Sequence, residues 1–99
     1  MRIYRGDSAI LLPSGKLSVI PFKTGRMRLR TPMSFTTNRK IAEGFAGGTS
    51  DHYGVGYIPV LITAEADRVE KTVFWDFERE VLPVGTFEVI SIEPLEKEK

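Results

Sequence analysis

Two glutamates separated by one residue are the feature of this sequence that most directly suggests chemistry. Glu78 and Glu80 flank Arg79 and stand just before the apolar pair Val81-Leu82. In an extended backbone, side chains two apart point to the same face, so we expect both carboxylates to face one site. Paired carboxylates suit glycosyl chemistry, because one can stabilise an oxocarbenium-like transition state while the other handles a proton or positions the incoming group. An isolated pair of this kind is more often a solvated strand entrance, so the interpretation depends on other residues.

The composition is that of one small globular protein and excludes several kinds of chemistry. The 99 residues, 41% of them hydrophobic, suit a single domain over residues 1–99, with a charged tail at 95–99 that we expect to fray. Cysteine is absent and histidine occurs once, which excludes disulfides, thiolate catalysis and multi-histidine metal sites, so no metal is expected. No stretch has the length and hydropathy of a signal peptide or a membrane span. We therefore expect a cytoplasmic protein without a membrane partner.

The net charge of +1 hides an uneven distribution along the chain. Residues 1–50 carry nine Lys/Arg and two Asp/Glu, whereas residues 51–99 carry five and eleven. Within the basic half, Arg26, Arg28 and Arg30 alternate with apolar residues, as in a strand with one apolar and one basic face. The simplest interpretation is a solvated strand face; binding of nucleic acid or an acidic partner is the alternative.

Short strands and one clear helix are expected to position these residues. Thr37 is a suitable N-cap for a helix over residues 38–46, which Gly47-Gly48 should end, and the glycine-rich residues 47–56 should form a loop near a ligand. Pro59 suggests an edge strand or a bulge. Residues 64–70 could form a short helix or an irregular loop, and a Pro-Val-Gly turn joins the last two strands. Patterns of apolar and β-branched residues predict strands at 2–4, 17–21, 26–30, 34–36, 57–63, 80–82 and 86–93. This is an α+β pattern.

Three short motifs occur in a suggestive order: Tyr4-Arg5-Gly6, Ser34-Phe35-Thr36 and Glu78-Arg79-Glu80. This order resembles the Arg-Ser-Glu class of mono-ADP-ribosyltransferases, whose best-known members are bacterial toxins and phage proteins. The resemblance is strongest over residues 34–46 and 78–92. It implies a small split β-sandwich of about six or seven short strands with one clear helix, around an ADP-ribosyltransferase-like core.

The resemblance implies an NAD site in which NAD is the substrate. Arg5 would hold the phosphates and ribose of NAD, a task suited to a guanidinium fork. Gly6 would let the backbone approach the nicotinamide amide. Ser34 would lie behind the catalytic acid as a hydrogen-bonding support, and Thr36 would line the nicotinamide pocket. Tyr53, in the glycine-rich segment, would stack on the nicotinamide ring.

The resemblance also assigns the two glutamates and an acceptor-recognition segment. Glu80 would be the catalytic glutamate, gripping the ribose 2′-hydroxyl as the bond to nicotinamide breaks. Glu78 would orient or deprotonate the acceptor, and a glutamate at this position goes with arginine as the modified residue of a target protein. Trp75 and Phe77 fall where the family recognises its target and would serve as aromatic anchors; packing in the core is the alternative for both.

Three other functions are compatible with the sequence. Water could be the acceptor, which would make the protein an NAD glycohydrolase. A non-catalytic module could instead bind nucleic acid or an acidic partner through Arg26, Arg28 and Arg30. A structural or assembly domain, including one of phage origin, is the last alternative.

Overall fold

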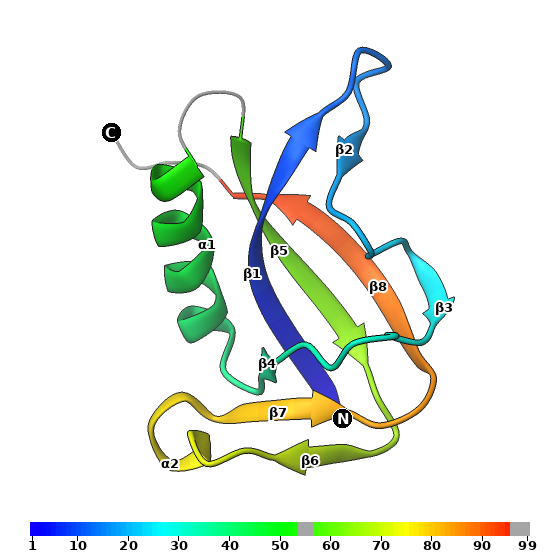
Figure 1. Cartoon of the computed structure of the whole chain (residues 1–99), viewed down its shortest axis with the longest axis vertical. Helices are drawn as coiled ribbons and strands as arrows, with labels where there is room; N and C mark the ends of the chain where they lie inside the picture. Colours follow the sequence, from blue (N-terminus) through cyan, green and yellow to red (C-terminus); the bar gives the residue numbers. More distant parts are fainter. Residues whose placement is uncertain (54–56, 96–99) are drawn as a thin grey trace.

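The computed structural model describes the backbone of residues 1–53 and 57–95, and the side chains of residues 1–46 and 57–95. Within these residues the chain is mostly β, with eight strands and two helices, which agrees with the α+β prediction in its coarse form (Figure 1). The elements are β1 (Arg2–Leu11), β2 (Leu17–Ser18), β3 (Gly25–Met27), β4 (Phe35–Thr36), α1 (Arg39–Tyr53), β5 (Tyr57–Glu65), β6 (Val69–Lys71), α2 (Trp75–Glu78), β7 (Glu80–Pro83) and β8 (Phe87–Pro94).

The strands form one antiparallel sheet in which β1 joins two halves. The strand order is β3-β8-β5-β1-β4-β7-β6, and β2 pairs with the far end of β1. The β1–β5 ladder runs from Arg2–Glu65 to Ile10–Tyr57, whereas β1 meets β4 only at Tyr4–Thr36. In Figure 1, β6 and β7 accordingly run across the long axis of the molecule, while β1, β5 and β8 follow it. The second half of the sheet is therefore turned relative to the first.

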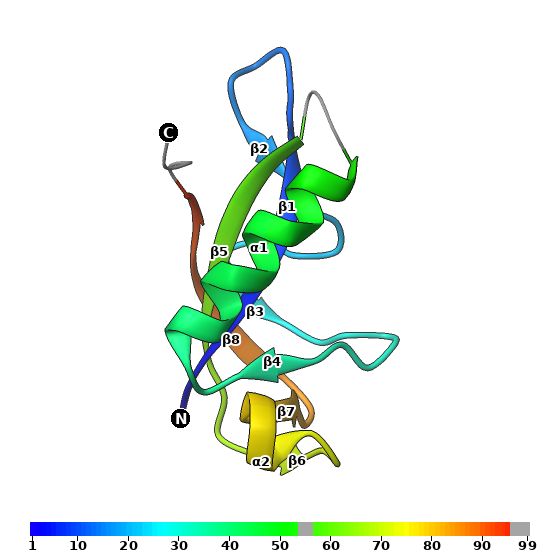
Figure 2. The same ribbon diagram turned by 90° about the vertical axis from the view of Figure 1, so that its left-hand side faces the viewer.

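The two faces of the β1–β5 ladder bury different partners. On one face, Ile3, Ile62 and their neighbours join a core whose centre is Phe35. The Phe35 ring makes edge-to-face contacts with Phe22 and Phe87, with ring centroids 5.7 and 5.8 Å apart, a favoured aromatic geometry. The other face is covered by α1, which crosses in front of β1 and β5 in Figure 2. The sheet is thus buried on both sides where the ladder is longest.

Helix α1 is longer than predicted and begins one residue later. The Asn38 side-chain oxygen accepts hydrogen bonds from the N–H groups of Lys40 (3.0 Å) and Ile41 (3.4 Å), so Asn38 rather than Thr37 is the N-cap. The helix continues through Gly47-Gly48 to Tyr53. Glycine lowers helix propensity by about 1 kcal/mol per residue without forbidding the helix. The predicted loop over residues 47–56 is therefore wrong as far as residue 53.

Strand β5 is central, which corrects the edge position predicted from Pro59. It lies between β1 and β8, and the bulge in its pairing falls at Thr63/Ala64. Pro59 lies one residue before the first β5–β8 pair, Val60–Pro94, so on that side its missing N–H falls outside the ladder. Residues 64–70 do not form the helix or irregular loop considered above, because they include the end of β5 and the start of β6.

The last two strands do not pair with each other. Strand β7 pairs with β4 and β6, while β8 pairs with β3 and β5. The turn between them therefore carries the chain from one half of the sheet to the other. Among the described helices, neither is long and apolar enough to cross a membrane.

Candidate active site

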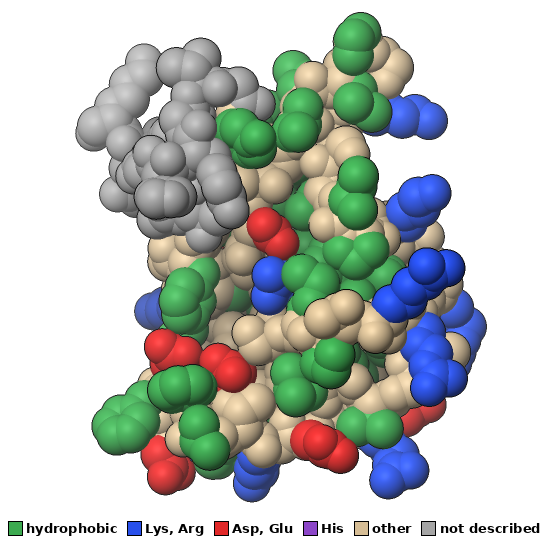
Figure 3. All heavy atoms as spheres, in the orientation of Figure 1, with side chains coloured by type: hydrophobic (Ala, Val, Ile, Leu, Met, Phe, Trp, Pro, Cys, Tyr) green, Lys and Arg blue, Asp and Glu red, His purple; other side chains and the backbone are tan. Residues whose placement is uncertain are grey.

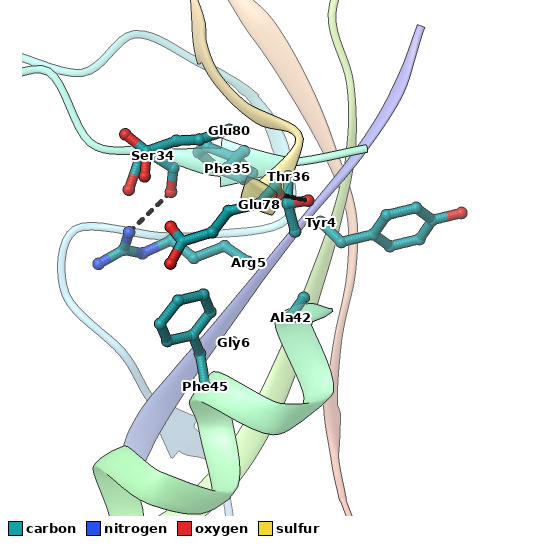
Figure 4. A pocket seen from close by; sticks show the side chains of 10 residues that line it. All are labelled: Tyr4, Arg5, Gly6, Ser34, Phe35, Thr36, Ala42, Phe45, Glu78 and Glu80. Carbon is teal, nitrogen blue, oxygen red and sulfur yellow. Dashed lines mark hydrogen bonds between the residues drawn. The ribbon is translucent and has the colours of Figure 1, made fainter. Parts of the chain in front are cut away.

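A pocket of about 290 Å³ lies where β1, β4, α1 and the junction of α2 with β7 meet. Chain segments that are far apart in the sequence contribute to it (Figure 4). Its lining residues are Tyr4, Arg5, Gly6, Ser34, Phe35, Thr36, Ala42, Phe45, Glu78 and Glu80. The structure thus brings together six of the nine predicted site residues: Arg5, Gly6, Ser34, Thr36, Glu78 and Glu80.

The Arg5 guanidinium is held in place from three sides. Its Nε donates to Asp7 Oδ2 at 3.1 Å, its Nη1 donates to the Ser34 carbonyl at 2.8 Å, and it lies 5.8 Å from the centroid of the Phe22 ring. Both charged side chains are largely buried, with 23% and 20% of their surfaces exposed. Within the described part of the chain Nη2 makes no hydrogen bond, which leaves donors for a ligand oxygen.

Asp7 is a site residue that the sequence analysis missed. It lies two residues after Arg5 on β1 and pairs with it, because side chains two apart on a strand share a face. The Arg-x-Asp spacing was therefore the available signal. The Asp7 carboxylate also accepts a hydrogen bond from the Ser8 N–H at 2.8 Å, so the anion that orients Arg5 is itself fixed.

The need for glycine at position 6 has a structural reason that the sequence analysis did not anticipate. A Cβ built on Gly6 would lie 1.8 Å from the carbonyl oxygen of Ala42 and 2.6 Å from the backbone nitrogen of Ala46. The backbone of α1 therefore lies directly on β1 at this point. The absence of a side chain at Gly6 is explained by this contact, whereas the predicted approach to a nicotinamide amide is not needed to explain it.

The pairing of β4 with β7 places Glu80. Thr36 lies opposite Glu80, and Phe35 opposite Val81. Because facing residues point to the same side of a sheet, Glu80 lies on the same side as Thr36, while Phe35 and Val81 belong to the core, where Phe35 also forms part of the pocket lining. Ser34 reaches this site through its carbonyl, which accepts from Arg5. No hydrogen bond of its hydroxyl is present among the described residues, so the predicted hydroxyl support for the acid is absent.

The two glutamates do not share a strand face, as the spacing had suggested. Glu78 is the last residue of α2, and Arg79 adopts a left-handed conformation with φ 51° and ψ 35° before β7 begins at Glu80. Both carboxylates nevertheless line the same pocket. Both carboxylates reach the pocket because the backbone turns at Arg79, and not because side chains alternate along a strand. Residues other than glycine rarely adopt the left-handed conformation of this turn.

Hydrogen bonds fix all three carbonyl groups of the Glu78-Arg79-Glu80 segment. The Thr36 hydroxyl donates to the Glu78 carbonyl at 2.7 Å, and it also accepts from the Asn38 N–H at 3.1 Å. The carbonyls of Arg79 and Glu80 accept from the N–H groups of Thr37 (3.2 Å) and Thr72 (3.1 Å). Thr36 thus lines the pocket, and its hydroxyl positions Glu78.

The structure divides the aromatic residues between core and pocket differently from the prediction. Trp75 packs partly against the core, with the cations of Lys71 and Arg79 at 4.4 and 5.1 Å from its ring, so the core alternative describes it better. Phe77 is 84% exposed but does not line the pocket. Phe45 is 51% exposed and does line it. The side chain of Tyr53, predicted to stack on nicotinamide, lies outside the described residues.

The charges of the pocket have a definite pattern. Arg5 is paired with Asp7, whereas neither Glu78 nor Glu80 forms an ion pair with another described residue. Two carboxylates without a counterion among the described residues favour a cationic group in the pocket, and the remaining donors of Arg5 favour an anionic one beside it. Comparison of the chain with protein-family models, curated proteins and solved structures finds no match. The chemistry of the pocket itself is therefore the basis for assigning a function.

Proposed function

We propose that this protein is an NAD-dependent mono-ADP-ribosyltransferase that modifies an arginine side chain of a target protein. The observation that carries the proposal is the meeting of Arg5, Glu78 and Glu80, from three distant segments, around one pocket. The sheet that turns at the Tyr4–Thr36 pair is compatible with the split β-sandwich core that this class implies.

The pocket suits the nicotinamide riboside end of NAD. Its volume of about 290 Å³ is at the lower limit of small-molecule sites, which range from roughly 300 to 1,000 Å³. The positively charged nicotinamide ring would be drawn to the carboxylates, and the half-exposed ring of Phe45 offers it a flat apolar surface. The unused donors of Arg5 would bind a phosphate oxygen, with the adenosine end outside the pocket.

The reaction breaks one bond and forms another at the same carbon. The bond from ribose C1′ to the nicotinamide nitrogen breaks, and its electron pair leaves with nicotinamide, which becomes neutral. Glu80 would hold the ribose 2′-hydroxyl and stabilise the positive charge that develops on the ribose. A guanidinium nitrogen of the acceptor then bonds to C1′, and Glu78 would take the proton released from that nitrogen.

The test uses NAD, a poly-arginine acceptor and a poly-lysine control. We expect nicotinamide release together with ADP-ribose attached to poly-arginine alone, measured by chromatography and mass spectrometry. Glu80→Gln should lower both signals on the order of 10²–10³-fold, as expected for removal of a group that stabilises transition-state charge. Glu78→Gln should reduce transfer more than nicotinamide release.

Glu88→Gln provides the matched control. Glu88 is an exposed glutamate on β8 and does not line the pocket, so its substitution should leave both signals unchanged. Equal inertness of the wild-type chain and the Glu80 variant would contradict catalysis. Nicotinamide release without a modified acceptor would instead identify an NAD glycohydrolase.

A further inference from the structure

A long segment of the chain carries positive charge without any acidic residue. Residues 8–42 contain seven Lys/Arg and no Asp or Glu. The five cations of this segment that precede β4 are exposed. In Figure 3, Lys and Arg side chains gather along the side of the molecule that carries β2 and β3. We call this set the basic ridge; its members are Lys16, Lys23, Arg26, Arg28 and Arg30.

The apolar residues between the arginines of the ridge turn inward. Met27 and Leu29 are partly buried and pack against the core, while Arg26, Arg28 and Arg30 are exposed. The alternation continues beyond the end of β3 at Met27. Along residues 26–30 the ridge therefore presents cationic groups to solvent without apolar side chains between them, whereas Ile20, between Lys16 and Lys23 in the sequence, is 87% exposed.

The ridge cations have no counterions among the described residues. Arg2, Arg5 and Arg39 each form an ion pair with a carboxylate, whereas no ion pair of the described residues involves the ridge. Glu88 lies opposite Arg26 in the β3–β8 pairing, but Arg26 bonds instead to the Thr86 hydroxyl at 3.0 Å. The positive charge of the ridge thus forms no ion pair with the part of the chain that the structure describes and is available to a ligand.

We propose that the basic ridge binds the phosphate backbone of nucleic acid. A polyanionic backbone needs little more than a row of exposed cations, and arginine is well suited to phosphate. A docking surface for a protein would instead require apolar or aromatic side chains at its centre, where lysine is depleted. Because Met27 and Leu29, between the three arginines, turn inward, this part of the ridge favours nucleic acid over an acidic protein.

The ridge leads toward the pocket. Ser34, which lines the pocket, follows Arg30 by four residues, and four residues span at most about 14 Å. Nucleic acid on the ridge would therefore lie beside the proposed active site. Binding itself does not depend on the catalytic proposal, and it can be measured without NAD.

The test measures binding of a fluorescent 20-base-pair DNA duplex by anisotropy between 50 and 200 mM salt. If four ridge cations contact phosphates, the slope of log K against log salt should be about −4. The triple variant Arg26→Gln, Arg28→Gln, Arg30→Gln should weaken binding on the order of 100-fold at 100 mM salt. The magnitude of the slope should fall by about 3.

A second triple variant controls for the loss of net charge. Arg39→Gln, Lys40→Gln and Lys71→Gln also remove three exposed cations. They lie on α1 and on β6, which is at the opposite end of the sheet from β3, so most of the affinity and slope should remain. The Glu80→Gln variant should bind like the wild-type chain, which separates this proposal from the catalytic one.

Two results would overturn the proposal. The first is an equal loss of affinity in both triple variants, because the location of positive charge on the ridge would then make no difference to binding. The second is displacement of the duplex by poly-glutamate at an equal concentration of charge, which would identify an acidic protein as the ligand. Circular dichroism spectra of both variants show whether they fold.

Discussion

The two walls of the pocket are held by different forces. On one wall, α1 packs on β1 with almost no space between their backbones, since a Cβ at Gly6 would lie 1.8 Å from the Ala42 carbonyl oxygen. On the other wall, the Glu78-Arg79-Glu80 segment is held by hydrogen bonds to its three carbonyl groups. The packed wall fixes the distance between a helix and a strand. The hydrogen-bonded wall instead fixes the direction of the backbone that carries the two carboxylate side chains. The first should be sensitive to added volume, and the second to lost polar partners and altered backbone conformation.

The largest effect is expected from Gly6→Ala. The new methyl group meets backbone atoms that cannot rotate away, so α1 must shift and the free energy of unfolding should fall by about 3 kcal/mol. Urea unfolding followed by circular dichroism measures the change. Gly44→Ala is the matched control, because a Cβ there meets nothing within 4 Å; this change should stabilise the chain by about 0.5–1 kcal/mol. Equal effects of the two substitutions would contradict the packed wall.

Thr36→Val tests the hydrogen-bonded wall at nearly constant volume. The hydroxyl that serves the Glu78 carbonyl and the Asn38 N–H is lost in a residue that is only 5% exposed. Unpartnered buried polar groups should lower the free energy of unfolding by about 1–3 kcal/mol. Thr86→Val, at an exposed threonine, should change stability by no more than about 0.5 kcal/mol. If thermal melts show the same shift for both, the wall does not depend on Thr36.

A pair of substitutions at Arg79 tests the left-handed turn. Arg79→Val should destabilise the chain by about 1–2 kcal/mol, because a β-branched side chain fits poorly at φ 51°. Arg79→Gly should change stability by less than about 1 kcal/mol, because relief of backbone strain offsets loss of the contact with Trp75. Chemical denaturation distinguishes the two. A glycine variant as unstable as the valine variant would show that the side chain, and not the backbone conformation, matters.

The smallest effect on stability is expected from Phe45→Ala. The Phe45 ring is 51% exposed, so its removal should cost about 1 kcal/mol or less. The same variant should bind nicotinamide more weakly under the catalytic proposal, as measured by calorimetry. A loss of stability as large as that of Gly6→Ala would instead show that the ring belongs to the packed wall.

Several parts of this structure followed from local patterns in the sequence. Alternation along residues 26–30 predicted which side chains face outward, and it holds even where the strand has ended. The last strand was also predictable from spacing, whereas β1 continues to Leu11, well beyond the predicted residues 2–4. The boundaries were less so, because glycine at positions 47 and 48 weakens a helix without ending it. The edge position predicted from Pro59 was wrong for a similar reason, since the effect of a proline depends on which N–H groups the neighbouring strands require.

The sequence by itself determined the chemistry that is available: two carboxylates one residue apart, a guanidinium near the first strand, a basic segment without acids and no cysteine. It also determined local faces, such as the shared side of Arg5 and Asp7. Only the tertiary structure decided that the left-handed backbone conformation of Arg79 directs both glutamates into one pocket. It also decided that α1 fills the space beside Gly6 and that Phe45 remains half exposed. These outcomes depend on contacts between segments tens of residues apart, such as β4 with β7, and local periodicity contains no information about which distant segments meet.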